Sequence, residues 1–424
     1  MLDVQPTEKI ELNDFSGIVG VDQIRTLRTL GDKLKGKSVT HVNSTAFGGG
    51  VAEILRSMVP LMQNLGLNVY WKVIKGDLEF FNVTKKIHNA LQGANLSLDE
   101  DEKRTYVENN KINSGETSLD TDIVMVHDAQ PAALIDYYHN KNTNWIWRCH
   151  VDLSSPNLAV WSFLEPYIAR YNAAVFTAKE YVVPSLSVQK LLIRPPSINP
   201  LSEKNRDLTD SEIKNILDRF EIKADQPIIT QVGRFDPWKN PSAAIDVYRL
   251  VKKEIPTVQI LLIGGMATDD PEGLLYFERT ARHATEDPDI HILLTELRGI
   301  KDLEVNALQR ASQVVLQMST REGFGLTVSE ALWKGVPVVA RKVGGIPLQV
   351  VDGQNGFLVD TAEQAAERTL WLLKNRETAW QMGASGKERV RDNFLIVSYV
   401  RDYLQLFNEL ITSQSSAVST RSPS

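Results

Sequence analysis

Short apolar runs alternate with segments of helical spacing along almost the whole chain, and this alternation constrains the fold more than any other feature of the sequence. Continuous apolar runs are typical of strands buried on both faces of a parallel sheet. The segments between them are long enough for the crossover helices that parallel strands need. The sequence therefore predicts two doubly wound α/β domains. The predicted strands are 38–42, 68–74, 122–126, 145–149 and 173–177 in the first half, and 228–232, 258–263, 290–294, 314–317 and 337–340 in the second.

A proline-rich stretch divides the chain near its middle. Residues 194–201 carry three prolines among polar neighbours, a composition that resists both helix and sheet. We therefore expect a first domain over 1–197 and a second over 198–393. The residues 413–424 are rich in serine and threonine and predict a disordered tail.

Three helices are predicted from spacing and end signals. Apolar residues recur at helical intervals over 51–65, directly after a glycine cluster. Thr361 and Gln364 resemble a capping box, which predicts a helix from there through Leu373. A further helix is expected over 378–392.

Composition excludes several classes of function. A chain of 424 residues exceeds what one core usually organises, so two domains of roughly 200 residues each are expected. No apolar run approaches the roughly 20 residues that span a bilayer, and residues 1–13 lack the basic flank and apolar centre of a secretory signal. The one cysteine, Cys149, fits a reducing cytoplasm. The net charge of −6 gives no general attraction for nucleic acid. Small anionic molecules therefore remain as the expected class of ligand.

The stretch 321–333 carries two carboxylates, Glu322 and Glu330, on either side of a glycine-rich turn that opens a predicted helix. The glycines let backbone N–H groups at the helix start approach an anion, and the helix dipole favours negative charge there. Carboxylates accept several hydrogen bonds, so both glutamates suit a ligand rich in hydroxyls. The alternative is a surface turn followed by an acidic helix, which the neighbouring motifs disfavour.

A basic loop, 233–240, follows the first predicted strand of the second half. This is the carboxyl end of a strand, where ligands of open α/β sheets bind. Arg234 offers a planar fork for phosphate oxygens and Lys239 a mobile point charge, and together they could neutralise a diphosphate. The alternative is a solvated basic loop without a ligand.

A glycine cluster, 48–50, ends the first predicted strand and opens the helix over 51–65. Its backbone amides could cradle a phosphate or a sugar hydroxyl. It departs from the dinucleotide-binding fingerprint, because Glu53 stands where the third glycine belongs. The alternative is that 48–50 form a tight turn that binds no ligand.

Two histidines each end a predicted strand of the first half, followed closely by an aspartate. His127 precedes Asp128, and His150 lies two residues before Asp152. We expect both histidines to face the crevice between the domains. A zinc site is conceivable, but a core histidine satisfied by hydrogen bonds is the commoner outcome.

Taken together, the glycine cluster, the Gly-Arg-Phe-Asp-x-x-Lys motif over 233–239 and the Glu-x-Phe-Gly-Leu motif over 322–326 resemble the retaining two-domain glycosyltransferases that use nucleotide-sugar donors. This resemblance extends over nearly the whole chain. More narrowly, the sequence resembles the trehalose glycosyltransferring synthases and their relatives, the trehalose phosphorylases. This closer resemblance rests on the stretches 41–53, 83–93 and 147–154.

The resemblance implies a GT-B arrangement, in which two Rossmann-like domains face a cleft and residues 394–412 cross back as a helix onto the first domain. It implies a catalytic group of His150, Arg234, Lys239 and Glu322. Arg234 and Lys239 would hold the donor diphosphate, Glu322 the hydroxyls of the transferred glucose and His150 the donor sugar near the reacting carbon. Further contacts are implied to the donor from Gly49, Gly50, Gly325, Leu326 and Glu330, the last to the ribose, and to the acceptor from His88, Asn89 and Asp152.

The implied reaction is a reversible transfer of glucose from UDP-, ADP- or GDP-glucose to free glucose. Its product is α,α-trehalose, formed with retention of configuration and without a metal or cofactor. A trehalose phosphorylase is the nearest alternative, because the same cations would bind inorganic phosphate. A catalytically silent nucleotide-sugar sensor is the alternative from another class. The sequence leaves open the preferred base, the dominant direction and whether the chain forms a homo-oligomer.

Overall fold

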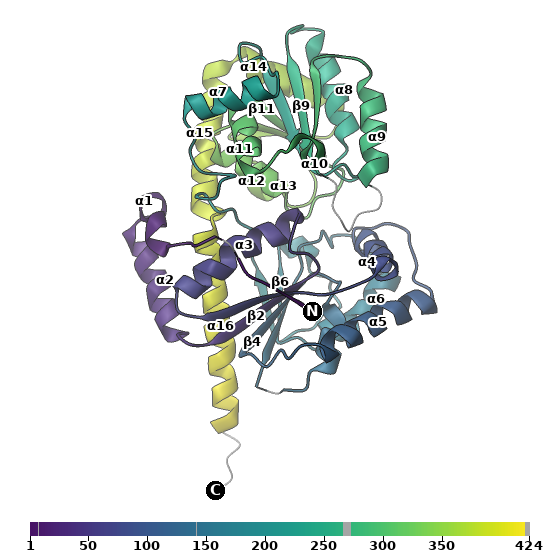
Figure 1. Cartoon of the computed structure of the whole chain (residues 1–424), viewed down its shortest axis with the longest axis vertical. Helices are drawn as coiled ribbons and strands as arrows, with labels where there is room; N and C mark the ends of the chain where they lie inside the picture. Colours follow the sequence, from purple (N-terminus) through teal and green to yellow (C-terminus); the bar gives the residue numbers. More distant parts are fainter. Residues whose placement is uncertain (7, 141, 266–272, 420–424) are drawn as a thin grey trace. The chain divides into compact units, whose positions relative to one another are not determined.

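A computed structural model describes residues 1–6, 8–140, 142–265 and 273–419 (Figure 1). The chain divides into two units by its internal contacts. Unit 1 comprises Met1–Pro196 together with Ile396–Ser424, and unit 2 comprises Ser197–Leu395. Unit 1 is therefore built from two separate stretches of the chain, whereas unit 2 is continuous.

The sheet of unit 1 has the strand order β1-β3-β2-β4-β5-β6-β7. Its pairings are parallel except at one edge, where β1 runs antiparallel to β3. The strand order reverses between β2 and β4. From there β3 extends the sheet on one side, and β5, β6 and β7 extend it on the other. The strands are β1 Leu2–Val4, β2 Ser38–Asn43, β3 Asn68–Val73, β4 Ile123–His127, β5 Asn144–Arg148, β6 Ala173–Phe176 and β7 Lys190–Ile193.

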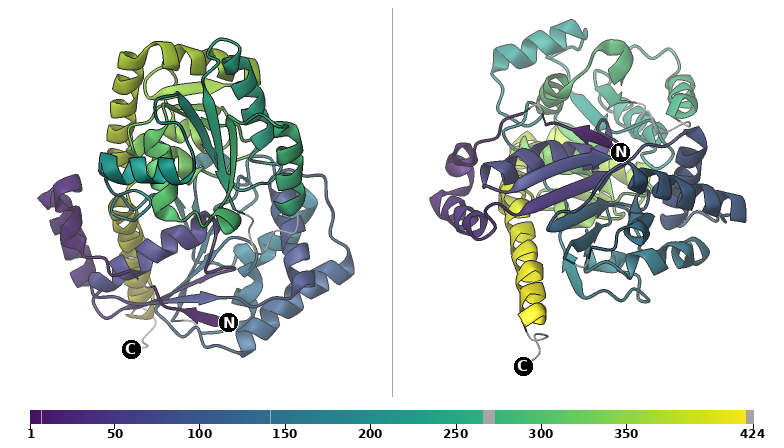
Figure 2. Two further views of the ribbon diagram at one scale, coloured as in Figure 1. Left: turned by 45° about the horizontal axis from the view of Figure 1, so that its top comes forward. Right: turned by 60° about the horizontal axis from the view of Figure 1, so that its bottom comes forward.

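The last helix of the chain, α16 (Ile396–Ser419), completes unit 1. It packs against α2 and α3, and the yellow helix lies beside these purple helices in both views of Figure 2. Tyr399, Tyr403 and Phe407 on α16 are fully buried. The other helices of the unit are α1 Ser16–Val19, α2 Val21–Lys33, α3 Gly49–Asn64, α4 Leu78–Leu91, α5 Glu100–Gly115 and α6 Leu158–Ile168, with short 3-10 turns at Leu12–Phe15, Ala132–Tyr137 and Lys179–Tyr181.

Helix α16 continues to Ser419, whereas the sequence predicts a disordered tail from residue 413. The serine-rich composition suggested disorder. A helix that is already anchored by buried residues extends at little cost, since nucleation is its expensive step. The rest of the predicted tail, 420–424, lies outside the described residues.

The sheet of unit 2 is entirely parallel, with the strand order β10-β9-β8-β11-β12-β13. The order reverses between β8 and β11, which are direct neighbours. The strands are β8 Ile228–Val232, β9 Gln259–Gly264, β10 Ile290–Leu294, β11 Val314–Gln317, β12 Val338–Arg341 and β13 Gly356–Val359.

Helices flank this sheet and bury its apolar strands. One cluster of buried side chains joins the strands to α8 and α14, and a second joins them to α7 and α11. Thr361 caps α14 by accepting a hydrogen bond from the Gln364 amide at 3.2 Å, but the Gln364 side chain accepts from the Asp360 amide at 2.9 Å, so the predicted capping box is only half formed. The helices are α7 Asp210–Arg219, α8 Pro241–Lys252, α9 Gly273–Ala284, α10 Thr295–Arg298, α11 Asp302–Ala311, α12 Leu326–Trp333, α13 Ile346–Gln349, α14 Ala362–Lys374 and α15 Arg376–Asn393.

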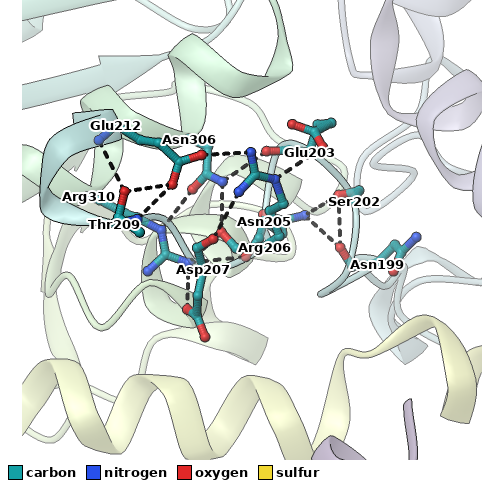
Figure 3. A network of polar contacts seen from close by, with 10 residues as sticks. All are labelled: Asn199, Ser202, Glu203, Asn205, Arg206, Asp207, Thr209, Glu212, Asn306 and Arg310. Atoms are coloured by element: carbon teal, nitrogen blue, oxygen red, sulfur yellow. Dashed lines mark hydrogen bonds and ion pairs between the residues drawn. The ribbon is translucent and has the colours of Figure 1, made fainter. Parts of the chain in front are cut away.

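The segment that follows the proline-rich stretch is fixed to α11 by a polar network (Figure 3). The Asn306 amide donates to the carbonyls of Glu203 and Arg206, both at 2.9 Å. Arg310 donates to the Arg206 carbonyl at 2.9 Å as well. Thr209 then caps α7 in a capping box with Glu212. These contacts hold the segment 203–209, which has no regular secondary structure, against α11.

The structure confirms the predicted fold class and every predicted strand to within one or two residues at each end. The three predicted helices correspond to α3, α14 and α15. β1, β7 and β13 were not predicted, and each is three or four residues long. None of the described helices combines the length and apolar character that crossing a bilayer requires.

Candidate functional site

The strand reversal in unit 2 places two loops side by side. In an open α/β sheet, ligands bind beyond the carboxyl ends of the strands at such a reversal. The loop after β8 carries Arg234 and Lys239, and the loop after β11 carries Glu322. Neighbouring strands thus deliver the predicted cations and the predicted carboxylate to one edge of the sheet.

Asp236 organises the loop after β8. Its side chain is 1% exposed, accepts a hydrogen bond from the Lys239 backbone amide at 2.8 Å and lies 3.5 Å from the Arg234 guanidinium. The carboxylate therefore closes the turn and lies beside the guanidinium of Arg234. Asp236 belongs to the motif over 233–239, but no role was predicted for it, although an aspartate before proline is a turn signal.

Glu322 is held firmly at the end of β11. It is 7% exposed, and its Oε2 atom lies 2.5 Å from Lys239 Nζ. The same oxygen accepts hydrogen bonds from Ser319 Oγ at 3.2 Å and Gln317 Nε2 at 3.3 Å. A buried carboxylate needs such partners to remain charged. The side chain is therefore fixed in one position before any ligand arrives.

A buried glutamine joins the two loops. Gln231, on β8, donates from Nε2 to the Lys239 carbonyl at 3.0 Å and accepts at Oε1 from the Met318 amide at 2.9 Å. The Thr320 amide also donates to the Trp238 carbonyl at 2.7 Å. Gln231 was not predicted, because a single polar residue inside an apolar strand gives no sign of which loops it will bridge.

The turn before α12 needs glycine at one position. Gly325 caps the helix with φ at +84°, a conformation that residues with a Cβ rarely adopt. A Cβ there would also lie 3.2 Å from Glu322 Cγ. The amides of Gly325 and Leu326 thus begin a helix beside Glu322, where the helix dipole favours an anion.

Glu330 lies one turn into α12 and is fully buried. Lys204, from the segment before α7, places Nζ 2.9 Å from Glu330 Oε1. Lys204 was not predicted, because it is distant in sequence from every motif. The predicted contact of Glu330 with a ribose stays a prediction, and a ribose would have to share this carboxylate with the lysine.

The glycine cluster in unit 1 forms a turn into α3. Gly48 and Gly49 both have positive φ, +71° and +78°, and α3 begins at Gly49. Gly49 and Gly50 are exposed, so no side chain covers them. Their amides belong to the first turn of a sixteen-residue helix, an arrangement that suits anion binding.

The predicted acceptor residues also lie in unit 1. His88 and Asn89 lie in the last turn of α4 and are half-buried. Asp152 is 2% exposed and accepts a hydrogen bond from the Ser154 amide at 2.9 Å. Their contact with an acceptor sugar stays a prediction.

His150 follows β5 and is anchored by Asp128, which follows β4. The His150 amide donates to Asp128 Oδ1 at 2.7 Å. His127 is 1% exposed, and the expectation that both histidines face a crevice between the domains stays a prediction. Both ring nitrogens of His127 lie within hydrogen-bond distance of other histidines, Nε2 with His41 and Nδ1 with His150. The described residues contain no group of three or more His, Cys, Asp or Glu side chains arranged to hold a metal.

Asp128 makes stability depend on pH. Burial raises its pKa from 3.8 to about 6, although the His150 amide and Arg148 oppose the shift. The folded state therefore prefers the protonated acid, and this stabilisation is lost as pH rises from about 4 through 6. Asp128 has φ at +63°, which asparagine tolerates.

We expect Asp128→Asn to be more stable than the parent at pH 7.5 by on the order of 2 kcal/mol, with a smaller gain at pH 5. Urea denaturation of both proteins at the two pH values measures this difference. An equal difference at pH 5 and 7.5 would contradict the raised pKa.

Two family models match the chain. "Trehalose synthase, N-terminal domain" matches residues 41–183, and "Glycosyl transferases group 1" matches residues 212–389. The first match lies within unit 1 and the second within unit 2.

A trehalose synthase from Pyrococcus horikoshii is 53% identical to the chain over 404 residues, covering 95% of the chain and 97% of the relative. A trehalose phosphorylase from Pleurotus pulmonarius is 27% identical, covering 84% of the chain but only 55% of the relative. Among solved structures, sucrose-phosphate synthase from Thermosynechococcus elongatus matches with a TM-score of 0.70 at 17% identity, covering 89% of the chain and 100% of that structure. At this identity the structural likeness shows the fold alone.

Proposed function

We propose a reaction for the chain, which belongs to the trehalose synthase family of group 1 glycosyltransferases. It transfers glucose from a nucleoside diphosphate glucose to the anomeric hydroxyl of free glucose. The product is α,α-trehalose, and the configuration at the transferred carbon is retained. The observation that carries the proposal is the contact between Lys239 and Glu322 at the strand reversal of unit 2. A cation for phosphate and a carboxylate for hydroxyls meet there, as a nucleotide sugar requires.

The cations act on the departing diphosphate. As the glycosidic bond breaks, negative charge grows on the leaving phosphate oxygen and positive charge on the sugar carbon. Arg234 and Lys239 favour that charge separation, and the amides of Gly325 and Leu326 add donors from a helix start. The amides of Gly49 and Gly50 are proposed to contribute in the same way. Because Asp236 and Gln231 fix the loop, little reorganisation is needed at the moment of reaction.

Glu322 holds the transferred glucose in place. One of its oxygens is already occupied by Lys239, Ser319 and Gln317, so the carboxylate is oriented before the sugar binds. A fixed acceptor of this kind positions hydroxyls at low entropic cost. The cationic loop beside it favours departure of phosphate rather than hydrolysis by a carboxylate pair. His150 is proposed to contact the donor sugar near the reacting carbon.

Product analysis tests the proposal. Purified protein with UDP-, ADP- or GDP-glucose and free glucose should form trehalose and release the nucleoside diphosphate, also after treatment with a chelator. Trehalose with nucleoside diphosphate should regenerate the nucleotide sugar. Formation of glucose phosphate from trehalose and inorganic phosphate would instead identify a phosphorylase. Donor binding without turnover would identify a sensor, and activity restored only by magnesium would overturn the metal-free mechanism.

A further inference from the structure

Three histidines from neighbouring strands of unit 1 form one row of hydrogen bonds. His41 lies on β2, His127 ends β4 and His150 follows β5. His41 Nδ1 lies 3.1 Å from His127 Nε2, and His127 Nδ1 lies 3.0 Å from His150 Nε2. Both neighbouring pairs have ring centroids 5.4 Å apart. The central ring thus uses both nitrogens to join the other two.

The row is electrically neutral. Burial lowers the pKa of His41 to about 3 and lowers the pKa of His127 and His150 well below its usual value. The buried Arg148 guanidinium lowers the pKa of the latter two further by charge repulsion. Each ring therefore carries one N–H, and each of the two contacts needs one N–H and one bare nitrogen.

Only two proton arrangements satisfy both contacts. In the first, His41 and His127 donate from Nδ1, so His150 accepts at Nε2 and keeps its own proton on Nδ1. In the second, every proton moves to Nε2, and His41 carries a buried N–H at its far nitrogen. His41 is fully buried, and its Nε2 makes no hydrogen bond with any residue that the structure describes. A buried N–H without an acceptor is among the rarest features of folded proteins, so the first arrangement is favoured.

We infer that His41 and His127 are positioning residues that fix the tautomer of His150, so that His150 presents Nδ1–H as a hydrogen-bond donor to the substrate. The inference rests on the proposed function in one respect, namely that His150 contacts the donor sugar. The row anchors Nε2 and leaves Nδ1 as the nitrogen for a ligand. A substrate oxygen at this point must then accept a hydrogen bond rather than donate one.

The tautomer can be measured without substrate. In protein labelled with 15N-histidine, the protonated and the bare ring nitrogens give separate resonances, and the His150 signals are assigned by their loss in His150→Gln. We expect His150 to carry its proton on Nδ1 in the parent protein. A proton on Nε2 would overturn the inference. This measurement does not depend on which reaction the protein catalyses, so it remains decisive if no trehalose is formed.

Two variants at the central ring separate positioning from packing. His127→Phe keeps a ring but removes both nitrogens, so both tautomers of His150 should be populated and kcat should fall roughly 10-fold, with KM for the donor nearly unchanged. His127→Gln can donate with its amide nitrogen and accept with its oxygen, so it should recover much of that loss. Met125→Leu, two residues earlier on β4, is the matched control and should leave both readouts unchanged. An unaltered tautomer and kcat in folded His127→Phe would contradict the inference.

Discussion

Replacing Arg234 with alanine should lower the turnover number with saturating donor by roughly 100-fold or more, on the scale of losing one preorganised donor to a developing negative charge. Arg234 lies beyond the carboxyl end of β8, and Asp236 holds the turn that carries it. The guanidinium is about one-third exposed, so its removal opens no cavity in the core. Steady-state kinetics with varied nucleotide sugar, together with a thermal unfolding curve, measures both consequences.

Arg219→Ala provides the matched control. Arg219 is another partly exposed arginine of unit 2, paired with Glu304 on α11 at 3.1 Å. Its loss should leave turnover near that of the parent, because Arg219 ends α7, before β8, and belongs to neither the loop after β8 nor the loop after β11. Near-normal turnover of the Arg234 variant with saturating donor would refute the role assigned to this residue.

The second large effect concerns the pair of Lys239 and Glu322. Lys239→Met should lower turnover by about 100-fold or more, because it removes the second cation from the diphosphate. It should also cost about 3 kcal/mol of stability, since Glu322 is left buried without its cation. Adding Glu322→Gln to this variant should restore most of the stability and none of the activity. Urea denaturation and initial rates on the two single variants and the double variant complete the cycle.

Lys252→Met is the control for this cycle. Lys252 is also a partly buried lysine of unit 2 that is paired with carboxylates, Asp287 at 2.7 Å and Asp289 at 3.0 Å. It ends α8, away from the loops at the strand reversal. Its replacement should reduce stability and leave turnover intact. If the double variant at 239 and 322 regained activity, the lysine would serve only to neutralise the glutamate.

The buried centre of each sheet could be predicted because its strands carry their own signal. A strand such as β9 is apolar at nearly every position, since both its faces are covered. The edge strands have no such pattern. β7 is mostly exposed, and β1 is three residues long and pairs antiparallel with β3. An edge strand pairs with the backbone N–H and C=O groups that the neighbouring strand leaves unpaired. The local sequence of the edge strand does not indicate where those groups lie.

The residues of the site also include some that could be predicted from local sequence and some that could not. Arg234, Lys239 and Glu322 were predicted because each follows a recognisable strand in a recognisable turn. His41 was not, because its importance comes from a contact with His127, eighty-six residues away. Gln231 and Lys204 were missed for the same reason. Side chains that act through partners distant in the sequence become visible only when the fold brings the partners together.

The two-part construction of unit 1 has a consequence for the order in which the protein can fold during translation. Residues of unit 2 leave the ribosome as one uninterrupted stretch and can fold once Leu395 has emerged. The sheet of unit 1 is made first, yet the surface that Tyr399, Tyr403 and Phe407 bury stays open until the last helix is synthesised. The first half of the polypeptide is therefore the last to be finished, and its apolar surface stays uncovered while the roughly two hundred residues of unit 2 are synthesised.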